Sequence, residues 1–291
     1  MPSLDDLKKR IVSVKSTQKI TKAMKMVAAA KLKKAQDSAE KGRPYSEKMQ
    51  NIILNLTNSI SDLENAPKLL VGTGNNKTHL CVVMTSDKGL CGGFNSNICR
   101  LARNYFEKAL KEEKNLKIIT VGAKGLDQLK RTYGKYIVKK LSFKEKKKIT
   151  FNEAKEIGQI IINLFNKNEF DKCILFYNNF KNIMTQIPQA KQIIPIKKTE
   201  NSEKKDNEFF EFEPDEDEIL EDLLPKNIST QVFRAFLENA ASEQGSRMTA
   251  MDNATRNAGD LVDKLTINYN RSRQASITKE LIEIISGAES L

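Results

Sequence analysis

The sequence has no tryptophan, one histidine and four cysteines among its 291 residues. The cysteines, Cys81, Cys91, Cys99 and Cys173, include no C-x-x-C pair, and one histidine is too few for the usual Cys/His zinc sites. A Ser/His/Asp catalytic set would have to use that histidine, His79, which lies in a short apolar run and is better explained as a buried strand residue. We therefore expect no metal site, no catalytic residues and reduced structural thiols.

Long apolar segments are also missing. No run reaches the roughly eighteen apolar residues that a membrane-spanning helix needs, and the N-terminus, MPSLDDLKKRIVSV, lacks the apolar core of a signal peptide. Aromatic residues make up 7% of the chain and charged residues 30%, which favours long exposed helices with one modest globular core. The net charge of +12 indicates an acidic partner, which could be nucleic acid, anionic lipid or an acidic protein surface.

The first forty residues are typical of one long amphipathic helix. No proline occurs between Pro2 and Pro44, so a helix of about forty residues, roughly 60 Å long, is allowed. Ser3 is a suitable N-cap. An apolar seam repeats at intervals of three and four residues, through Leu4, Leu7, Ile11, Val14, Thr21, Met24 and Ala28. Lysine and arginine dominate the other faces, and a helical pattern resumes over residues 45–63. Such a helix needs a partner for its seam.

The last fifty residues also predict a long helix, beginning after Pro225 and running for about sixty residues, roughly 90 Å. Its character changes three times along its length. Heptad spacing places Met251, Ala254, Ala258, Leu261 and Leu265 on one seam. A polar band, residues 268–274 (NYNRSRQ), interrupts the seam. The following segment, residues 277–285, is apolar around much of the helix. A helix with three different surfaces is expected to meet three different surroundings.

Between these helices the pattern changes to short β-branched runs alternating with helical segments. Strands are predicted near residues 79–85, 116–122, 136–143, 171–179 and 183–196, and helices over 95–114, 123–133 and 150–166. This alternation predicts a Rossmann-like α/β domain with a mostly parallel sheet. The expected fold is therefore α plus α/β, a long antiparallel coiled coil of terminal helices with an inserted α/β domain. We place the N-terminal shaft helix at 1–65, the α/β domain at 66–200, an acidic connection at 201–224 and the C-terminal shaft helix at 225–291.

A glycine-rich turn, SDKGLCGGFN, lies between a predicted strand and a predicted helix at residues 86–95. Helix N-termini attract anions, so the turn could cradle a phosphate. The segment fits neither G-x-x-x-x-G-K-[ST] nor G-x-G-x-x-G, however. A tight connection with an exposed loop explains it better.

Three segments together resemble the γ-subunit family of F-type ATP synthases. They are SLDDLKKRIVSVKSTQKITKAMKMVAAAKLKKAQ from Ser3, SDKGLCGGFN from Ser86, and the last fifty residues. Within the last, residues 277–288 match the C-terminal signature [IV]-T-x-E-x-x-[DE]-x-x-x-G-A at each defined position. The segments KMVAAAK, RMTAMDNA and TKELIEIISGA are similar in sequence to those of the alphaproteobacterial and mitochondrial branch of the family. Because no transit peptide precedes the first helix, a bacterial member is expected.

The resemblance implies a central stalk that rotates inside a hexamer of α and β subunits and couples proton flow to ATP synthesis or hydrolysis. The implied partners are those α and β subunits, the ε subunit and the membrane ring of c subunits. ATP, ADP and Mg²⁺ would be held by the partner subunits, leaving no cofactor on this chain. The implied location is peripheral, at the cytoplasmic face of the bacterial inner membrane in preference to the mitochondrial matrix side.

The resemblance also assigns contacts to individual residues. Arg271, Arg273 and Gln274 match family positions that meet loops of the β subunits. Met24 and Arg247 match positions near the acidic β lever loop. The apolar segment containing Ile277, Leu281, Ile284 and Ile285 matches the end of the shaft that turns in an apolar sleeve. For each residue the alternative is an ordinary solvated coiled-coil surface.

Two other functions fit parts of the pattern. A basic coiled coil could bind nucleic acid, although no aromatic residues interleave with the lysines of the first helix. A free-standing nucleotide-binding α/β enzyme would instead bind ATP by itself. The acidic residues 208–222 match no motif.

Overall fold

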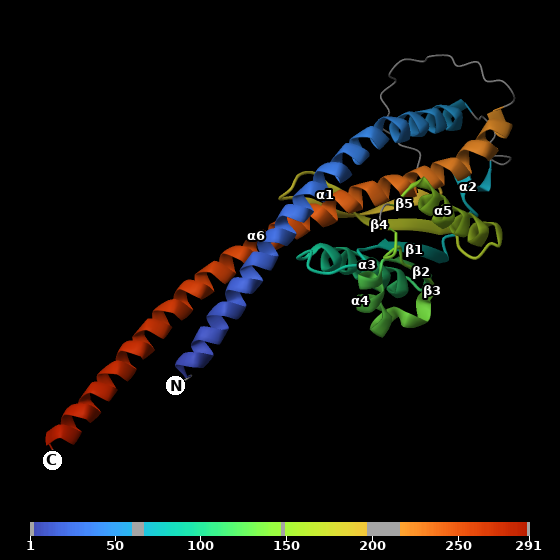
Figure 1. The fold of residues 1–291 in the computed structure, drawn as a ribbon. Coiled ribbons are helices and arrows are strands. Elements are labelled where there is room, and N and C mark those ends of the chain that lie inside the picture. Colours follow the sequence, from blue (N-terminus) through green and yellow to red (C-terminus); the bar gives the residue numbers. More distant parts are fainter. Residues whose placement is uncertain (1–2, 60–66, 147–148, 197–215, 290–291) are drawn as a thin grey trace. The chain divides into compact units, whose positions relative to one another are not determined.

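The computed structural model describes residues 3–59, 67–146, 149–196 and 216–289 (Figure 1). The helices are α1 (Leu4–Ser59), α2 (Lys68–Val71), α3 (Phe94–Lys111), α4 (Ala123–Tyr133), α5 (Phe151–Asn166) and α6 (Glu216–Glu289), with a 3-10 turn at Gly134–Tyr136. The strands are β1 (Thr78–Met84), β2 (Asn115–Val121), β3 (Ile137–Leu141), β4 (Lys172–Phe180) and β5 (Gln186–Ile194). The predicted strands and the longer predicted helices of the α/β region are confirmed; the short α2 was not predicted. None of the described helices is long and apolar enough to cross a membrane.

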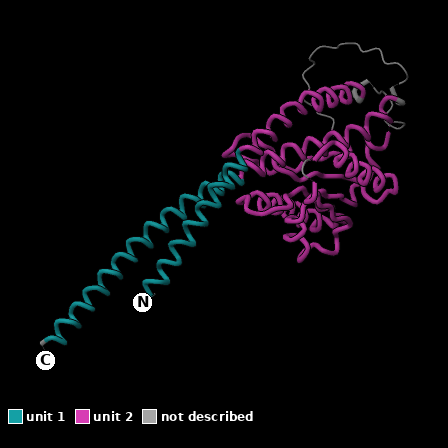
Figure 2. Tube along the Cα trace, viewed as in Figure 1, with its two compact units in different colours: residues 1–29, 247–291 teal, residues 30–246 magenta. Residues whose placement is uncertain are grey.

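The described residues divide into two compact units (Figure 2). Unit 1 combines the start of α1 with the end of α6, within Met1–Ala29 and Arg247–Leu291. Unit 2 covers Ala30–Ser246. The second half of α1 and the first half of α6 therefore belong with the sheet. This division differs from the predicted one, in which both helices were assigned to the shaft over their full length.

Unit 2 contains a five-stranded sheet in the order β3-β2-β1-β4-β5. Strands β1, β2, β3 and β4 are parallel, and the edge strand β5 pairs antiparallel with β4. Because the chain adds β2 and β3 on one side of β1 and β4 on the other, the direction of winding reverses between β1 and β4. In doubly wound folds this reversal opens a crevice at the carboxyl ends of the two strands.

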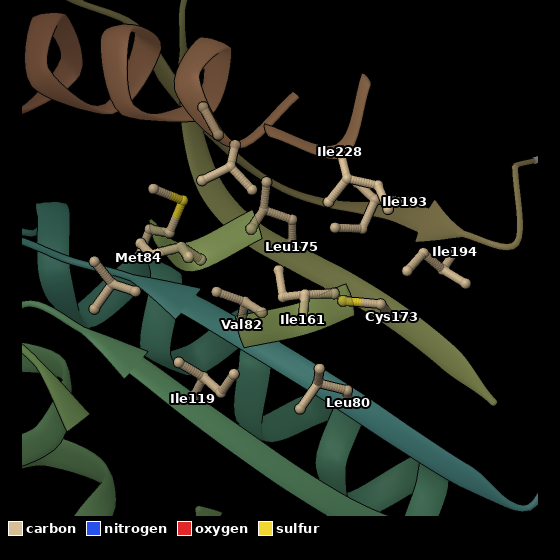
Figure 3. Close-up of a cluster of buried hydrophobic side chains, with 14 of the residues drawn as sticks. Leu80, Val82, Met84, Ile119, Ile161, Cys173, Leu175, Ile193, Ile194 and Ile228 are labelled. Atoms are coloured by element: carbon tan, nitrogen blue, oxygen red, sulfur yellow. The ribbon is translucent and has the colours of Figure 1, made fainter. Parts of the chain in front are cut away.

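Both faces of the sheet are covered, which explains the nearly continuous apolar strands. Alternate residues of β1 point to opposite faces. Leu80, Val82 and Met84 join a core formed with α5, β4, β5 and the first half of α6, as Figure 3 shows for Ile161 and Ile228. The opposite face packs against α3 and α4, whose buried apolar residues include Phe94, Ile98, Cys99, Ala102, Phe106, Leu129 and Tyr133. All four cysteines are buried, as expected for structural thiols.

Helix α6 begins at Glu216, so the prediction that it starts after Pro225 was wrong. Pro225 lies inside the helix and removes one backbone hydrogen bond, at a cost of about 3 kcal/mol in a helix interior. Leu220 and Leu224 are fully buried against Met49 and Ile53 of α1. Burying each leucine contributes about 1.5–3 kcal/mol, enough to offset the proline. The rest of the predicted acidic connection, residues 201–215, lies outside the described part of the chain.

Helix α1 likewise continues past Pro44 to Ser59. Its second half has a buried stripe of its own, made by Met49, Ile53 and Leu56. This stripe packs with Leu70 of α2 and with the first turns of α6. The helical pattern predicted for residues 45–63 is therefore confirmed through Ser59, and it serves the α/β unit.

Candidate partner-contact surface

The two helices of unit 1 are antiparallel, and polar contacts fix their register. Lys25 Nζ lies 2.5 Å from Asp252 Oδ1, and Thr255 Oγ1 donates to Thr21 Oγ1 at 2.8 Å. At Gly259, an added Cβ would come within 3.0 Å of Gln18 Nε2. Along this series the partner residue number in α1 falls from 25 to 21 to 18, while that in α6 rises from 252 to 255 to 259, so the two helices run in opposite directions. The predicted antiparallel pairing of the terminal helices is confirmed for this unit.

The buried seam of α6 follows this register. Its buried residues are Met251, Ala258, Val262 and Leu265. Leu261, which the sequence placed on the seam, is 46% exposed, so that assignment was wrong. A heptad can be divided as three plus four or as four plus three residues, and here the seam runs through Val262 in place of Leu261, while Ala254 and Thr255 are both half-buried. The Thr21–Thr255 hydrogen bond selects this alternative.

Asp252 joins two basic side chains at the edge of the seam. Its carboxylate accepts from Lys25 and, one helical turn on, from Arg256 Nη2 at 2.7 Å. The hydrogen bond from Lys25, followed by the nearby charge of Arg256, holds the pKa of Asp252 below its usual value. These residues were not singled out from the sequence, although opposite charges beside two apolar seams are a signal of pairing.

Most of the basic residues on the first part of α1 remain exposed. Lys8, Arg10, Lys15, Lys19, Lys22, Lys31, Lys33 and Lys34 all have exposed side chains. Within residues 3–59 and the other described ranges, the ion pairs formed by the first forty positions are Lys9 with Asp5 and Lys25 with Asp252. The helix therefore presents a long positive surface that the described part of the chain does not neutralise, as an acidic partner surface would require.

Met24 and Arg247 lie on different helices of unit 1 and are both half-buried. Met24 precedes Lys25, so the register places it close to the level of Asp252. Arg247 lies five residues before Asp252 on α6, which corresponds to about 7.5 Å along the helix axis. The structure thus brings these two predicted contact residues to neighbouring levels of the same helix pair.

Arg271, Arg273 and Gln274 form a separate, exposed group on α6. They lie about 36–40 Å along the helix axis from Arg247. Tyr269, just before this group, and Ser272, within it, are half-buried and continue the seam. The polar band is therefore two-sided, with one side turned toward α1 and the other toward solvent.

The apolar segment 277–285 is exposed throughout. Ile277, Leu281, Ile284 and Ile285 have exposed fractions of 48%, 54%, 68% and 57%. The register explains the exposure, because the first helical residue of α1, Leu4, is level with Ser272. Helix α6 therefore continues beyond the end of its partner (Figure 2). Consecutive exposed large apolar residues on a helix are characteristic of a surface that another molecule covers.

The glycine-rich turn at 86–95 uses its polar groups within unit 2. Asp87 accepts from the backbone nitrogen of Ala123, at the N-terminus of α4, at 2.9 Å, and also from Ser142 and Phe143. Asn95 exchanges hydrogen bonds with Ser86 at 2.8 and 3.1 Å. The N-terminus of α4 therefore already has a carboxylate of the same chain, Asp87, where an anion could otherwise bind.

Comparisons with known proteins agree with this architecture. The family profile described as ATP synthase matches residues 3–291. The ATP synthase gamma chain of Pelagibacter ubique (strain HTCC1062) is 70% identical over 291 residues, which cover all of both chains. The gamma chain of Rhizobium etli (strain CIAT 652) is 55% identical over 294 residues, again covering all of both. The chain belongs to the ATP synthase gamma chain family.

Solved structures of the family's fold extend the comparison. The Tetrahymena thermophila mitochondrial ATP synthase, in a structure of its central stalk and c-ring, contains a chain with 28% identity and a TM-score of 0.62. The match covers 81% of this chain and 99% of that one. A chain of the Euglena gracilis mitochondrial ATP synthase, 18% identical, matches the fold with a TM-score of 0.66 over 99% of this chain and 94% of that one. The resemblance inferred from the terminal motifs is thus confirmed, and the gamma chain is a subunit of an enzyme complex.

Proposed function

We propose that the chain is the rotating central stalk of a proton-translocating ATP synthase. Unit 1 would turn inside a hexamer of α and β subunits, and the α/β unit would join the ε subunit and the ring of c subunits. The observation that carries the proposal is the surface of α6, which changes from a paired seam to a polar band and then to an unpartnered apolar end. The full-length similarity to gamma chains supports it, as does the similarity, over 81% of this chain, to a chain solved with a central stalk and c-ring.

In this role the chain forms and breaks no covalent bonds, and it holds no cofactor. ATP, ADP and Mg²⁺ bind to the partner subunits. The complex lies at the cytoplasmic face of the bacterial inner membrane, and the chain is peripheral to that membrane through its partners. The positive surface of α1 faces acidic loops of the hexamer, near Met24 and Arg247.

The physical requirement of such a shaft is unequal contact with the conformations of a catalytic subunit. Moving a two-state equilibrium from 1:99 to 99:1 takes about 5.5 kcal/mol of differential interaction. Charge-assisted hydrogen bonds contribute about 1.5–3 kcal/mol each, so a few of them from Arg271, Arg273 and Gln274 suffice. The apolar residues 277–285 make few directional bonds, which suits an end that turns within an apolar sleeve.

The assignment is tested by isolating the complex. Detergent-solubilised membranes should yield this chain together with α and β subunits. Recovery of the chain free in the cytosol, with no α or β subunits attached, would refute the proposal. Tight and steeply salt-dependent binding of the isolated chain to duplex DNA would instead support a nucleic-acid binder.

The contact residues are tested by charge reversal in the assembled enzyme. Arg273→Glu should lower coupled ATP synthesis by about tenfold, the factor that corresponds to 1.4 kcal/mol, because a charge-assisted contact becomes repulsive. Lys264→Glu is the matched control, since Lys264 is also exposed on α6 but lies outside the polar band. Equal rates in the two variants would remove Arg273 from the proposed contact.

A further inference from the structure

Strand β4 is longer than its neighbour β1 at the carboxyl end. The parallel pairing of the two strands reaches Val83 and Phe176, whereas β4 continues to Phe180, paired with β5. In a strand, the N–H and C=O of one residue point to the same side, and that side recurs two residues later. The backbone groups of Asn178 and Phe180 on the β1 side therefore extend beyond the end of β1, where buried polar groups need other partners.

Side chains of α6 supply these partners. Asn178 N donates to Asn239 Oδ1 at 3.1 Å, and Asn178 O accepts from Ser242 Oγ at 3.3 Å. Phe180 N donates to Glu238 Oε2 at 3.2 Å. Glu238, Asn239 and Ser242 are all buried. One face of α6 thus takes the place of the missing strand along this part of β4.

The same face of α6 reaches the end of β1 and the turn that follows it. Asn239 Nδ2 donates to Met84 O at 3.3 Å, and Ser246 Oγ donates to Cys91 O at 2.7 Å. On the other side, Arg43 Nη2 of α1 donates to Glu238 Oε1 at 3.0 Å. We call Glu238, Asn239, Ser242 and Ser246 the polar face of α6. It spans about 12 Å of helix and ties α6 to β1, β4, the glycine-rich turn and α1.

The position of this face is informative. It lies at the carboxyl ends of β1 and β4, where the winding of the sheet reverses, the place where doubly wound folds bind ligands. The groups that would otherwise be available there are bonded to a helix of the same chain. The place where a ligand could bind is therefore occupied by polar side chains of α6.

We propose that the polar face of α6 is a torsional lock, which fixes the rotation of the helix about its own axis relative to the sheet. This inference rests on the proposed function, because only a rotor must pass torque between the α/β unit and the shaft part of the same helix. The apolar stripe of α6 beside it, Val232, Ala235 and Phe236, gives burial without directional preference. Hydrogen bonds are directional, and turning the helix by one residue step, about 100°, would move all four side chains away from their partners.

The experiment compares variants in the complete ATP synthase. Asn239→Ala combined with Ser242→Ala removes the bonds to β1 and to Asn178. Ser229→Ala is the matched control, because Ser229 is buried on the same helix and its hydroxyl bonds to the carbonyl of Pro225 within that helix. Torsional stiffness is measured from the angular fluctuation of a probe on the α/β unit while the catalytic hexamer is immobilised. Proton pumping per ATP hydrolysed is measured on the same preparations.

The double variant should show a loss of torsional stiffness and a loss of pumping per ATP, with ATP hydrolysis in the presence of an uncoupler retained. Ser229→Ala should match the unmodified chain. If the double variant does not assemble, Ser242→Ala alone removes one hydroxyl and should show a smaller loss of stiffness. A lowered melting temperature with unchanged stiffness and pumping would overturn the lock. A complex that lacks the unmodified chain would refute the proposed function instead.

Discussion

The α/β unit and the two-helix unit treat their apolar side chains in opposite ways. In the α/β unit, the central strands β1 and β4 are buried over nearly their whole length, and aromatic side chains such as Phe106 and Phe176 are fully enclosed. In the two-helix unit, one narrow seam is buried while Val12, Ile20, Met26, Val27, Ile267 and the residues of 277–285 are exposed. The first unit buries most of its apolar side chains within itself, whereas the second leaves apolar side chains exposed to other subunits. Mutations should therefore separate the two: those in the α/β unit alter folding, and those on the exposed helix faces alter assembly and coupling.

The largest expected effect is the loss of a core aromatic residue. The centroid of the Phe106 ring lies 5.1 Å from that of Tyr133 and 6.0 Å from that of Phe176, and the Phe106 side chain is inaccessible to solvent. Phe106→Ala should lower the free energy of unfolding by about 3–5 kcal/mol, because it removes buried surface and leaves a cavity. Urea unfolding of the isolated chain measures the change.

Phe151→Ala is the matched control for this prediction. Phe151 belongs to the same unit but is 41% exposed. Its ring packs edge-on against that of Phe233, with 5.6 Å between the ring centroids. The expected loss is well below that of Phe106→Ala. Equal losses would show that exposure does not distinguish the two sites, and the comparison between buried and exposed apolar residues would fail within the α/β unit itself.

The second prediction uses the only histidine. His79 is 2% exposed, as expected for a strand residue. Its Nε2 lies 2.7 Å from Asn76 Oδ1, and its Nδ1 lies 2.8 Å from the hydroxyl of Tyr105. With the proton on Nε2, the neutral ring donates to Asn76 and accepts from Tyr105, so both nitrogens are bonded without a charge.

Burial, with smaller effects from Lys114 and Lys172, lowers the pKa of His79 to about 4. The unfolded chain therefore binds a proton at His79 between pH 6.5 and 4 while the folded chain does not, so stability falls as the pH is lowered through this window. The slope from one group is at most about 1.4 kcal/mol per pH unit. His79→Gln should flatten this part of the stability curve measured by urea unfolding. Parallel curves for the two proteins would contradict the assignment.

The strands and most helices of the α/β unit could be predicted because burial on both faces leaves a direct trace, in β-branched apolar runs bounded by turn residues. The start of α6 could not, because Pro225 is a strong local signal, while the burial of Leu220 and Leu224 depends on α1, far away in the sequence. The polar face of α6 was also invisible. Its partners are backbone groups in the part of β4 that extends beyond the end of β1, and a sequence does not show where one strand extends beyond its neighbour.

The contact residues were found by a different route. Met24, Arg247, Arg271, Arg273 and Gln274 were assigned by resemblance, and the structure adds that the last three are exposed on one segment of α6. Within the described residues, burial does not distinguish Arg271, Arg273 and Gln274 from other exposed residues of α6, because the surface that would select them belongs to another subunit. Their role stays a prediction that the charge-reversal experiment tests.

The smallest expected effect tests the seam itself. Val262 is 9% exposed and Leu261 is 46% exposed, although the two are adjacent and Leu261 is the larger residue. Val262→Ala should destabilise the two-helix unit by about 1 kcal/mol, because it removes buried methyl groups between α1 and α6. Leu261→Ala should change the stability by less than about 0.5 kcal/mol, as for other surface substitutions.

Hydrogen exchange at the backbone amides of residues 7–28, in the isolated chain, measures the pairing of α1 with α6 directly. Faster exchange in Val262→Ala than in Leu261→Ala supports the register set by Thr21 and Thr255. The reverse order would restore Leu261 to the seam. In the assembled enzyme the ranking of the two variants could change, because Leu261 is available to a partner subunit whereas Val262 is already occupied by α1. A coupling defect in Leu261→Ala, without faster exchange in the isolated chain, would sharpen the distinction between apolar residues that hold the shaft together and those that the shaft presents to its surroundings.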